Sequence, residues 1–271
     1  MTQNNNKLAI VAGNGELTTT LAKSAREQGF QTYAIAITDE ARQRLDAVCT
    51  KVYSFAPGEV SKILECIKKE LINQIVFIGK VSKINFLRNL HKLDWLAIKN
   101  LYRFRDFHDD SFHNAVSDFL KEHNINILPQ TMFLKELFIE KEILSKRKPT
   151  IEERVDIQYG YDAAKKIAGL DIGQTVVVKN KMIVAIEAIE GTDEAIKRGC
   201  ILSKSGVVVV KVAKPNQDER FDVPVIGIQT VEMLGKNGGG VLAFEAGKTI
   251  VADKEETANV ADKYNICLIA I

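Results

Sequence analysis

The stretch LAIVAGNGELTTTLAKSAREQG, residues 8–29, decides the fold of the N-terminal half of the chain. It opens with five apolar residues and continues with the turn Gly13-Asn14-Gly15. Apolar residues then recur at helical spacing until Gly29, which suits a helix C-cap. The stretch therefore predicts a buried strand, a tight turn and a helix.

Buried strands and amphipathic helices keep alternating beyond this stretch. The apolar patterns predict strands at residues 32–37 and 74–78 and helices at residues 61–71 and 109–123. Strands that are buried on both faces and separated by helices are typical of a parallel sheet with right-handed crossovers. We therefore predict an α/β fold whose first part, residues 1–135, is a Rossmann-like nucleotide- or phosphate-binding domain.

A basic run, LSKRKPT at residues 144–150, separates this domain from a region in which the pattern of predicted strands and helices is different. We predict a linker at residues 136–151 and a mixed α/β domain at residues 152–271. Two hairpins are expected in the second domain, one around Asn180-Lys181 and one around Ala246-Gly247. The other elements predicted there are helices at residues 151–169 and 253–264 and strands at residues 207–212 and 266–271.

Composition limits the classes of function. The chain has 271 residues, of which 46% are hydrophobic, so it can bury a sizeable core and suits two domains of ordinary size. Its 37 Lys and Arg residues nearly balance its 35 Asp and Glu residues. This balance argues against nucleic acid as the main partner, and the basic residues have to be interpreted locally.

Cysteine usage and hydropathy point to a cytosolic protein. The four cysteines lie far apart without a CxxC spacing, which argues against a zinc ribbon and for reduced thiols that fill the core. The N-terminus is short and polar, and an uninterrupted apolar run of about 18 residues is missing. We therefore expect a chain that is neither exported nor membrane-spanning.

The turn Gly13-Asn14-Gly15 is the first candidate site. Glycines let the backbone approach a phosphate at a helix N-terminus, where the helix dipole favours an anion. Thr18 stands where a dinucleotide fingerprint has its third glycine, and Asp39 follows a Thr rather than closing the second strand. We predict nucleotide or phosphate contact at Gly13, Asn14 and Gly15. A purely structural turn is the alternative.

Asp109 and Asp110 form the second candidate, at the start of a predicted helix. They either face a ligand or serve as first-turn acids that the helix dipole stabilises. The four histidines show no metal-ligand spacing, and a GxSxG nucleophile elbow is absent from the sequence.

The motif EAIEGTD, residues 187–193, is the third candidate. Glu187, Glu190 and Asp193 follow one another at intervals of three around the turn Gly191-Thr192. The pattern predicts that a strand ends here and that Thr192 caps the next helix, so acids reach a strand-to-helix junction where active sites of α/β domains gather. An ordinary acidic helix start is the alternative.

The segment KVAKPNQDERFDVP, residues 211–224, is the fourth candidate. Pro215 and Pro224 bracket a charged loop, whose basic and acidic members are Lys211, Lys214, Asp218, Arg220 and Asp222. Carboxylates are the ligands that divalent cations prefer, and Lys and Arg bind phosphate. The loop therefore predicts a site for a divalent cation and a phosphate together.

Three quoted stretches give the chain a family resemblance. AIVAGNGEL, AGLDIGQTVVVKNKMIVAIEAIEGTD and VVVKVAKPNQDERFDVPVIG, the last followed by Thr230-Val231-Glu232, resemble the LpxI-type UDP-2,3-diacylglucosamine pyrophosphatases of lipid A biosynthesis. The likeness covers nearly the whole chain. Asn14 departs from the second glycine of many members, and residues 84–107 match little of the family.

The resemblance implies hydrolysis of UDP-2,3-diacylglucosamine to UMP and 2,3-diacylglucosamine 1-phosphate. It also implies Mg²⁺, water attack at the β-phosphate, a homodimer and two domains that close around the ligand. Because the substrate carries acyl chains, it implies a cytoplasmic protein that contacts the inner membrane peripherally, with help from Lys146, Arg147 and Lys148.

We assign roles to the candidate residues on this basis, with catalysis in the second domain. The expected metal ligands are Asp222, Asp218, Glu187 and Asp193. The expected catalytic residues are Asp222, Asp218, Lys214 and Lys211, with an acid not bound to metal as the general base. The expected substrate-binding residues are Gly13, Asn14, Gly15, Asp109, Asp110, Glu190, Gly191, Thr192 and Arg220. Two rival functions remain: another nucleotide-dependent enzyme, such as a reductase or ligase, and a non-catalytic nucleotide-sugar sensor.

Overall fold

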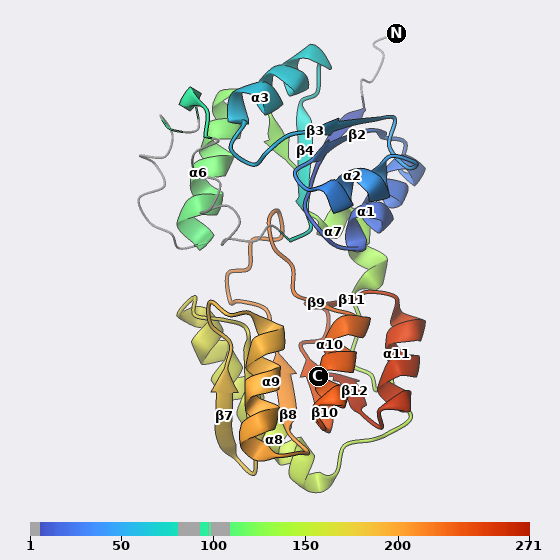
Figure 1. The fold of residues 1–271 in the computed structure, drawn as a ribbon, viewed down its shortest axis with the longest axis vertical. Helices are drawn as coiled ribbons and strands as arrows, with labels where there is room; N and C mark the ends of the chain where they lie inside the picture. The colour runs from blue at the N-terminus through green and yellow to red at the C-terminus, as the bar shows by residue number, and fades with distance from the viewer. Residues whose placement is uncertain (1–5, 81–92, 97, 99–108) are drawn as a thin grey trace. The chain divides into compact units, whose positions relative to one another are not determined.

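The chain folds into two compact units in the computed structural model (Figure 1). The structure describes residues 6–80, 93–96, 98 and 109–271, and the side chains of these residues apart from 109–112. Unit 1 comprises Met1–Leu134 together with Asp218–Asp222, and unit 2 comprises Lys135–Gln217 and Val223–Ile271. Both units contain strands and helices, so the predicted α/β class is confirmed.

Unit 1 is built on a five-stranded sheet in the order β3-β2-β1-β4-β5, and all its neighbouring strands are parallel. The predicted parallel sheet is thus confirmed, although β3 and α2 were not among the predicted elements. Its elements are β1 (Lys7–Ala12), α1 (Leu17–Glu27), β2 (Gln31–Ala36), α2 (Asp39–Leu45), β3 (Lys51–Ser54), α3 (Val60–Lys69), β4 (Gln74–Ile78), α6 (Asp109–Glu122), β5 (Asn126–Ile127) and α7 (Thr131–Leu134).

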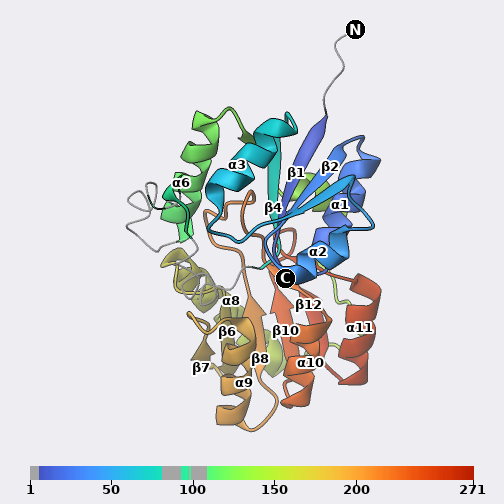
Figure 2. The ribbon, with the colours of Figure 1, turned by 45° about the horizontal axis from the view of Figure 1, so that its top comes forward.

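Helices cover both faces of this sheet, with α3 and α6 on one side and α1 and α2 on the other (Figures 1 and 2). Ala9 and Val11 of β1 pack with Leu64 of α3 and Leu120 of α6 in one core cluster. Because successive side chains of a strand point to opposite faces, the residues between them face the other layer. This two-sided burial explains why β1 is apolar from Leu8 onward.

Unit 2 is built on a mixed five-stranded sheet in the order β12-β10-β8-β6-β7, beside a short two-stranded sheet of β9 and β11. Its elements are η3 (Lys135–Leu137), α8 (Ile151–Gly169), β6 (Thr175–Lys179), β7 (Met182–Ile186), α9 (Thr192–Ser203), β8 (Val208–Lys211), β9 (Val225–Ile226), α10 (Ile228–Lys236), β10 (Val241–Phe244), β11 (Ile250–Val251), α11 (Lys254–Lys263) and β12 (Cys267–Ala270).

Two core clusters show which helices cover which face of the unit 2 sheet. One cluster joins Ile157 and Ala164 of α8 to Val176 and Val178 of β6. The other joins Val177, which lies between those two valines, to residues of α9, α10 and α11. Helix α8 therefore covers one face, and the other three helices cover the opposite face.

The predicted hairpin around Asn180-Lys181 is confirmed by the antiparallel pairing of β6 and β7. Both turn residues have left-handed backbones, with φ of 51° and 60°, as a two-residue turn that follows the twist of the strands requires. Their amides donate hydrogen bonds of 2.8 and 2.6 Å to the carboxylate of Asp156, a buried residue of α8. This carboxylate thereby ties α8 to the end of the sheet.

The predicted hairpin around Ala246-Gly247 is wrong. Strand β10 lies between β8 and β12 in the large sheet, whereas β11 pairs in parallel with β9. The amides of Ala246 and Gly247 donate to the carbonyls of Ile271 and Ile139 instead of closing a turn between two strands. Turn-forming residues between two apolar runs mark a change of direction, but they do not say that the two runs pair with each other.

The segment predicted as a linker, residues 136–151, packs along unit 2. Ile139 is 5% exposed and belongs to the core cluster on the α9 face. Phe138 and Ile143 form isolated bridges with Ile250 of β11 and Ile269 of β12. The basic residues that suggested a linker follow a stretch, residues 137–144, whose apolar side chains are buried or half-buried against unit 2.

Two of the four cysteines fill the core as the sequence predicts, whereas Cys49 and Cys66 are half-buried. All four are unbridged. Cys200 and Cys267 are buried, and burial raises the pKa of both thiols to about 11. Thiols with such a high pKa stay protonated and act as small apolar side chains in the core.

Gly199 lets helix α9 lie close to the sheet of unit 2, which gives a stability prediction. A Cβ atom on Gly199 of α9 would lie 2.6 Å from Val177 Cγ1, whereas one on Gly169 of α8 would meet its nearest neighbour, Pro215, at 3.7 Å. We expect Gly199→Ala to lower the free energy of unfolding by roughly 1–3 kcal/mol through overpacking. The matched control Gly169→Ala should leave it unchanged or raise it by up to about 1 kcal/mol, since Ala favours helix. Urea denaturation followed by circular dichroism measures both, and equal midpoints for the two variants would contradict the packing argument.

Candidate active site

Four strands of the unit 2 sheet end at the same edge of that sheet. Strand β6 is antiparallel to β7 and β8, and β10 is parallel to β8 and β12, so β7, β8, β10 and β12 run in the same direction. Three charged residues stand at their carboxyl ends: Glu187 after β7, Lys211 at the end of β8 and Glu245 after β10. The amide of Glu187 bonds the carbonyl of Thr175, the register partner of Lys211, and the amide of Glu245 bonds the carbonyl of Lys211. We call this edge of the sheet, which carries Glu187, Lys211 and Glu245, the carboxyl edge.

A first polar network at the carboxyl edge joins three of the predicted site residues. Lys211 Nζ lies 3.3 Å from Thr192 Oγ1 and donates to the Val225 carbonyl at 3.1 Å. Thr192 Oγ1 donates to Glu187 Oε1 at 2.8 Å. The structure therefore brings Glu187, Thr192 and Lys211 together, as the sequence led us to expect for one site.

The capping role predicted for Thr192 is wrong. Gly191 is the N-cap of α9, with φ of 86°, and no side-chain hydrogen bond caps this helix. Thr192 is the first helical residue, and its hydroxyl hydrogen points to Glu187. The Gly191-Thr192 turn thus places a hydroxyl between a carboxylate and an ammonium group, a contact that local spacing does not reveal.

A second polar network beside it was missed by the sequence reasoning. Lys165 Nζ of α8 donates to Glu245 Oε2 at 3.0 Å and to the Ala213 carbonyl at 2.9 Å. Glu245 Oε2 also accepts the amide of Ala213 at 2.9 Å. Tyr161 lies one helical turn before Lys165, and burial, followed by the charge of Glu245, raises the pKa of its phenol. The sequence did contain one signal for this network, because Glu245 is an acid that directly follows a buried strand.

Lys214 is held close to these networks through the short segment that follows β8. It forms an ion pair with Asp171, and the two side chains are only 10% and 19% exposed. Its amide donates to Gln217 Oε1 at 3.0 Å. Because Ala213 is anchored by Glu245 and Lys165, the lysines at positions 165, 211 and 214 all lie around the end of β8.

The other acids of the EAIEGTD motif have more ordinary surroundings. Glu190 is exposed and pairs with Arg198, which also donates to the Ile186 carbonyl. Hydrogen bonding to its own amide, and then Arg198, lowers the pKa of the Glu190 carboxyl. Asp193 lies in the first turn of α9, where the helix dipole stabilises an acid. Their predicted contacts with substrate and metal stay predictions.

The segment Asp218–Asp222 belongs to unit 1, although its flanks belong to unit 2. The ring of Phe221 stacks on His113 of α6 at 4.4 Å and lies 5.1 Å from Phe77 of β4. Glu219 accepts the amide of Gln130 with its carbonyl at 2.9 Å and the hydroxyl of Thr131 with its carboxylate at 2.8 Å. These contacts attach the segment to unit 1.

Asp218 and Asp222 differ in their surroundings. Both oxygens of Asp218 accept hydrogen bonds from the Arg220 guanidinium, at 2.9 and 2.7 Å, and this contact lowers the pKa of the carboxyl. The same pairing raises the pKa of Arg220. The Asp222 side chain is exposed, and its amide bonds the Asp218 carbonyl at 3.1 Å. The two acids are thus one helical turn apart, with Asp218 already paired to a cation.

The glycine turn of unit 1 lies where the strand order of the sheet reverses, between β1 and β4. The amides of Gly13 and Asn14 donate to the carbonyls of Ile78 and Lys80 at 2.9 and 3.0 Å. The amide of Gly15, at φ of 127°, lies 3.3 Å from Glu40 Oε1. Two amides of the turn are therefore used by the chain itself, and the third faces a carboxylate. Contact of this turn with a phosphate stays a prediction.

Two further predictions made from the sequence concern residues that lie outside the described parts of the structure. Asp109 and Asp110 begin α6, but their side chains lie outside the described residues. Residues 84–107, which match little of the resembling family, also lie outside it apart from 93–96 and 98.

The four predicted metal ligands divide between the units, Asp218 and Asp222 in unit 1 and Glu187 and Asp193 in unit 2. Among the residues that the structure describes, no group of three or more His, Cys, Asp or Glu is arranged to hold a metal ion. The described residues therefore do not form a complete all-protein metal cage. Mg²⁺ does not require one, since it commonly binds through one or two carboxylates, water and substrate phosphates.

Comparison with known proteins gives a family for each half of the chain. A model of the LpxI N-terminal domain matches residues 7–137, and a model of the LpxI C-terminal domain matches residues 140–269. UDP-2,3-diacylglucosamine pyrophosphatase LpxI of Caulobacter vibrioides is 28% identical over 275 residues, which cover 98% of this chain and 97% of that protein.

Solved structures offer only distant likenesses. One is the ADP complex of N5-carboxyaminoimidazole ribonucleotide synthetase. The match covers 64% of this chain and 32% of the synthetase chain, at 11% identity and a TM-score of 0.28. The Thermotoga maritima enzyme of that name matches 69% and 43%, at 15% identity and a TM-score of 0.26. These scores are too low to carry an argument about function. The two domain models together cover nearly the whole sequence, and the chain belongs to the LpxI family.

Proposed function

We propose that this protein hydrolyses the diphosphate bond of UDP-2,3-diacylglucosamine, releasing UMP and 2,3-diacylglucosamine 1-phosphate in lipid A biosynthesis. The proposal rests on membership of the LpxI family and on the printed activity of the Caulobacter relative. The observation that carries it is the grouping of Lys165, Lys211 and Lys214 around the end of β8. Three cations at the carboxyl edge suit a substrate whose reacting group is a diphosphate.

The reaction needs a water molecule, a proton acceptor and stabilisation of charge on the phosphates. We propose that the water oxygen attacks the β-phosphorus, that the bond from this phosphorus to the bridging oxygen breaks, and that UMP leaves with that oxygen. Lys211 and Lys214 neutralise phosphate oxygens, and Arg220 assists in binding the substrate. The water proton passes to a carboxylate. Both oxygens of Asp218 already accept hydrogen bonds from Arg220, so we propose that one of the other acids is the base.

We also propose that Mg²⁺ takes part, with Asp222 as the central ligand and Asp218, Glu187 and Asp193 as further candidates. When bound, the ion would offset the negative charge of the diphosphate. Asp222 suits this role because its side chain is exposed and so can be reached by an ion and by water. The ligand set we favour is therefore small and is completed by water and substrate.

A substrate with acyl chains suggests contact with the inner membrane and a cytoplasmic location. No helix among the described residues is both long and apolar enough to cross a membrane. Within the basic run, Lys146 has a side chain that is 90% exposed, whereas Arg147 bonds Glu153 and the Gly240 carbonyl. We therefore propose peripheral contact through Lys146 and Lys148 without Arg147. A homodimer is also proposed, on the family resemblance alone.

The first prediction concerns Asp222. With purified protein, UDP-2,3-diacylglucosamine and Mg²⁺, we expect UMP release that a chelator suppresses. Asp222→Asn should lower kcat by about 100-fold or more, since it removes a charge worth several kcal/mol in the transition state. Asp46→Asn, an exposed aspartate of the same unit, is the matched control and should retain wild-type activity.

The outcomes separate the competing functions. UMP release that persists in chelator argues against Mg²⁺ but keeps the hydrolase. No UMP under any metal condition overturns the hydrolase and leaves a sensor, or another nucleotide enzyme if NAD or ATP protects the protein from thermal unfolding. Reaction in ¹⁸O-labelled water should place the label in the sugar 1-phosphate, and label in UMP would contradict attack at the β-phosphorus.

A further prediction concerns the first polar network. Lys211→Met should lower kcat by about 100- to 1,000-fold, the usual cost of losing one donor that stabilises transition-state charge. Thr192→Val removes the hydroxyl between Lys211 and Glu187 and should have a smaller effect in the same direction. Lys197→Met, an exposed lysine of α9, is the control. Steady-state kinetics and circular dichroism distinguish loss of catalysis from loss of fold, and a folded Lys211→Met protein with wild-type kcat would exclude this role.

A further inference from the structure

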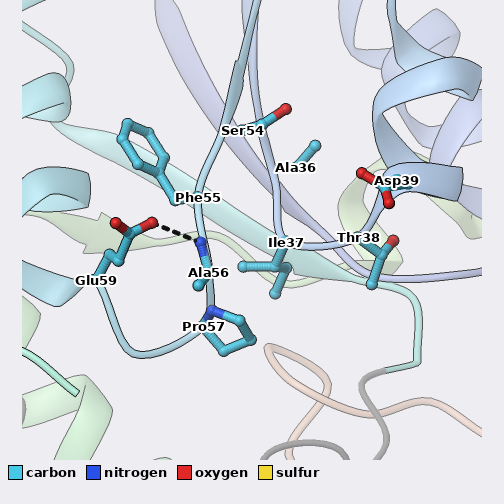
Figure 3. Close-up of a pocket in the computed structure, with 9 residues that line it drawn as sticks. All are labelled: Ala36, Ile37, Thr38, Asp39, Ser54, Phe55, Ala56, Pro57 and Glu59. Atoms are coloured by element: carbon cyan, nitrogen blue, oxygen red, sulfur yellow. Dashed lines mark hydrogen bonds between the residues drawn. The ribbon is translucent and has the colours of Figure 1, made fainter. Parts of the chain in front are cut away.

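In both units, a glutamate carboxylate holds the chain just beyond the end of a strand. In unit 1, the Glu59 carboxylate accepts the amide of Ala56, two residues after β3, at 2.8 Å and so fixes part of the wall of a pocket (Figure 3). In unit 2, the Glu245 carboxylate accepts the amide of Ala213, two residues after β8, at 2.9 Å. The first contact is local, whereas the second joins residues that are 32 positions apart.

The Glu245 side chain takes the place of a backbone acceptor in the sheet. The Glu245 amide donates to the Lys211 carbonyl at 3.0 Å, which continues the parallel ladder of β8 and β10. In a regular parallel ladder, the Glu245 carbonyl would next accept the Ala213 amide. This carbonyl instead accepts the Lys248 amide at 3.4 Å, and the carboxylate accepts the Ala213 amide. The side chain therefore extends the ladder by one bond beyond the ends of both strands.

Lys165 of α8 holds the other polar group of Ala213. Its Nζ donates to the Ala213 carbonyl at 2.9 Å and to the two Glu245 oxygens at 3.2 and 3.0 Å. An ammonium group has three donors, so these contacts suit a residue that holds the chain rather than one that binds a phosphate. Ala213 is 2% exposed, and a buried peptide group without a partner is costly. The two charged side chains therefore determine the path of the chain at Ala213.

The Ala213 peptide lies next to two lysines that the proposed function uses. Lys211 lies two residues before Ala213, and Lys214 directly follows it. The Lys214 side chain is itself held by an ion pair with Asp171. A shift of the Ala213 peptide would move the backbone of Lys214, and a misplacement of about 1 Å can cost 100-fold in rate.

We propose that Lys165 and Glu245 are positioning residues for the reaction. They hold the Ala213 peptide, and through it they place Lys211 and Lys214 for contact with the substrate phosphates. This inference rests on the proposed function, since it takes a diphosphate as the group that the two lysines contact. It gives a role in the reaction to an ion pair that joins α8 to the residue after β10.

A matched pair of variants separates positioning from stability. Lys165→Met removes an ion pair and a bond to a carbonyl at the carboxyl edge. Arg147→Met removes an equivalent set of contacts, with Glu153 and with the carbonyl of Gly240 just before β10. We expect both variants to lower the midpoint of thermal unfolding by similar amounts. Only Lys165→Met should lower kcat for UMP release, by about 10- to 100-fold, and the loss should appear in kcat rather than in KM.

Two substitutions of Glu245 test the contact with a measurement that does not depend on activity. Amide hydrogen exchange of the full-length protein, followed by NMR, reports how firmly the Ala213 amide is held. Glu245→Ala removes the acceptor, so we expect the Ala213 amide to exchange about 10-fold faster or more, with a loss of kcat like that of Lys165→Met. Glu245→Gln keeps a side-chain carbonyl as the acceptor. It should restore slow exchange and recover kcat several-fold relative to Glu245→Ala.

The possible results separate the contact, the positioning role and the proposed function. Unchanged exchange of the Ala213 amide in Glu245→Ala overturns the contact as the element that holds the chain. Faster exchange with wild-type kcat overturns the positioning role and leaves a structural ion pair. Equal loss of kcat in Lys165→Met and Arg147→Met also overturns that role, because the loss then follows stability. A wild type that releases no UMP overturns the proposed function and with it the role in catalysis, whereas the exchange rates still decide whether the contact holds the chain.

Discussion

The common direction of β7, β8, β10 and β12 is the constraint on which the candidate active site depends. Parallel strands end at the same edge, so residues far apart in the sequence are delivered to one place without any local signal. Glu187, Lys211 and Glu245 meet in this way, and the backbone bonds that join them to their neighbours fix their spacing. Strand β6 runs the opposite way, so that the segment before it, with Asp171 and Gln174, lies at the same edge.

The charges at this edge are partly buried and are held by matching partners. Lys165 and Glu245 have side chains that are 28% and 15% exposed, and the Ala213 backbone supplies both an acceptor and a donor to them. Removing one partner from such a pair leaves a charge with poor solvation, which costs more than the intact pair contributes. The networks therefore hold the lysines in position before a ligand binds. A phosphate that takes the place of one of the carboxylates would contact lysines that are already oriented.

The segment Asp218–Asp222 shows how a short stretch can belong to another unit than its flanks. Phe221 contributes ring contacts with His113 and Phe77, and Glu219 adds two hydrogen bonds. An aromatic ring that packs against other rings stabilises such an attachment beyond the area it buries. The acids on both sides of this ring are thereby fixed relative to unit 1.

The sequence by itself determined the strand, turn and helix at residues 8–29, the parallel sheet of unit 1 and the turn at Asn180-Lys181, because these features depend on apolar periodicity and on turn residues within a short window. It also indicated Glu187, Thr192 and Lys211, since each stands at a strand end or helix start. Only the tertiary structure decided the partner of β11, the packing of residues 136–151 and the attachment of Phe221 to unit 1. It alone showed Lys165 and Glu245 as a pair, 80 residues apart. Pairing between distant segments is set by the packing of the whole core and by strand direction, and neither leaves a mark in the local pattern of residues.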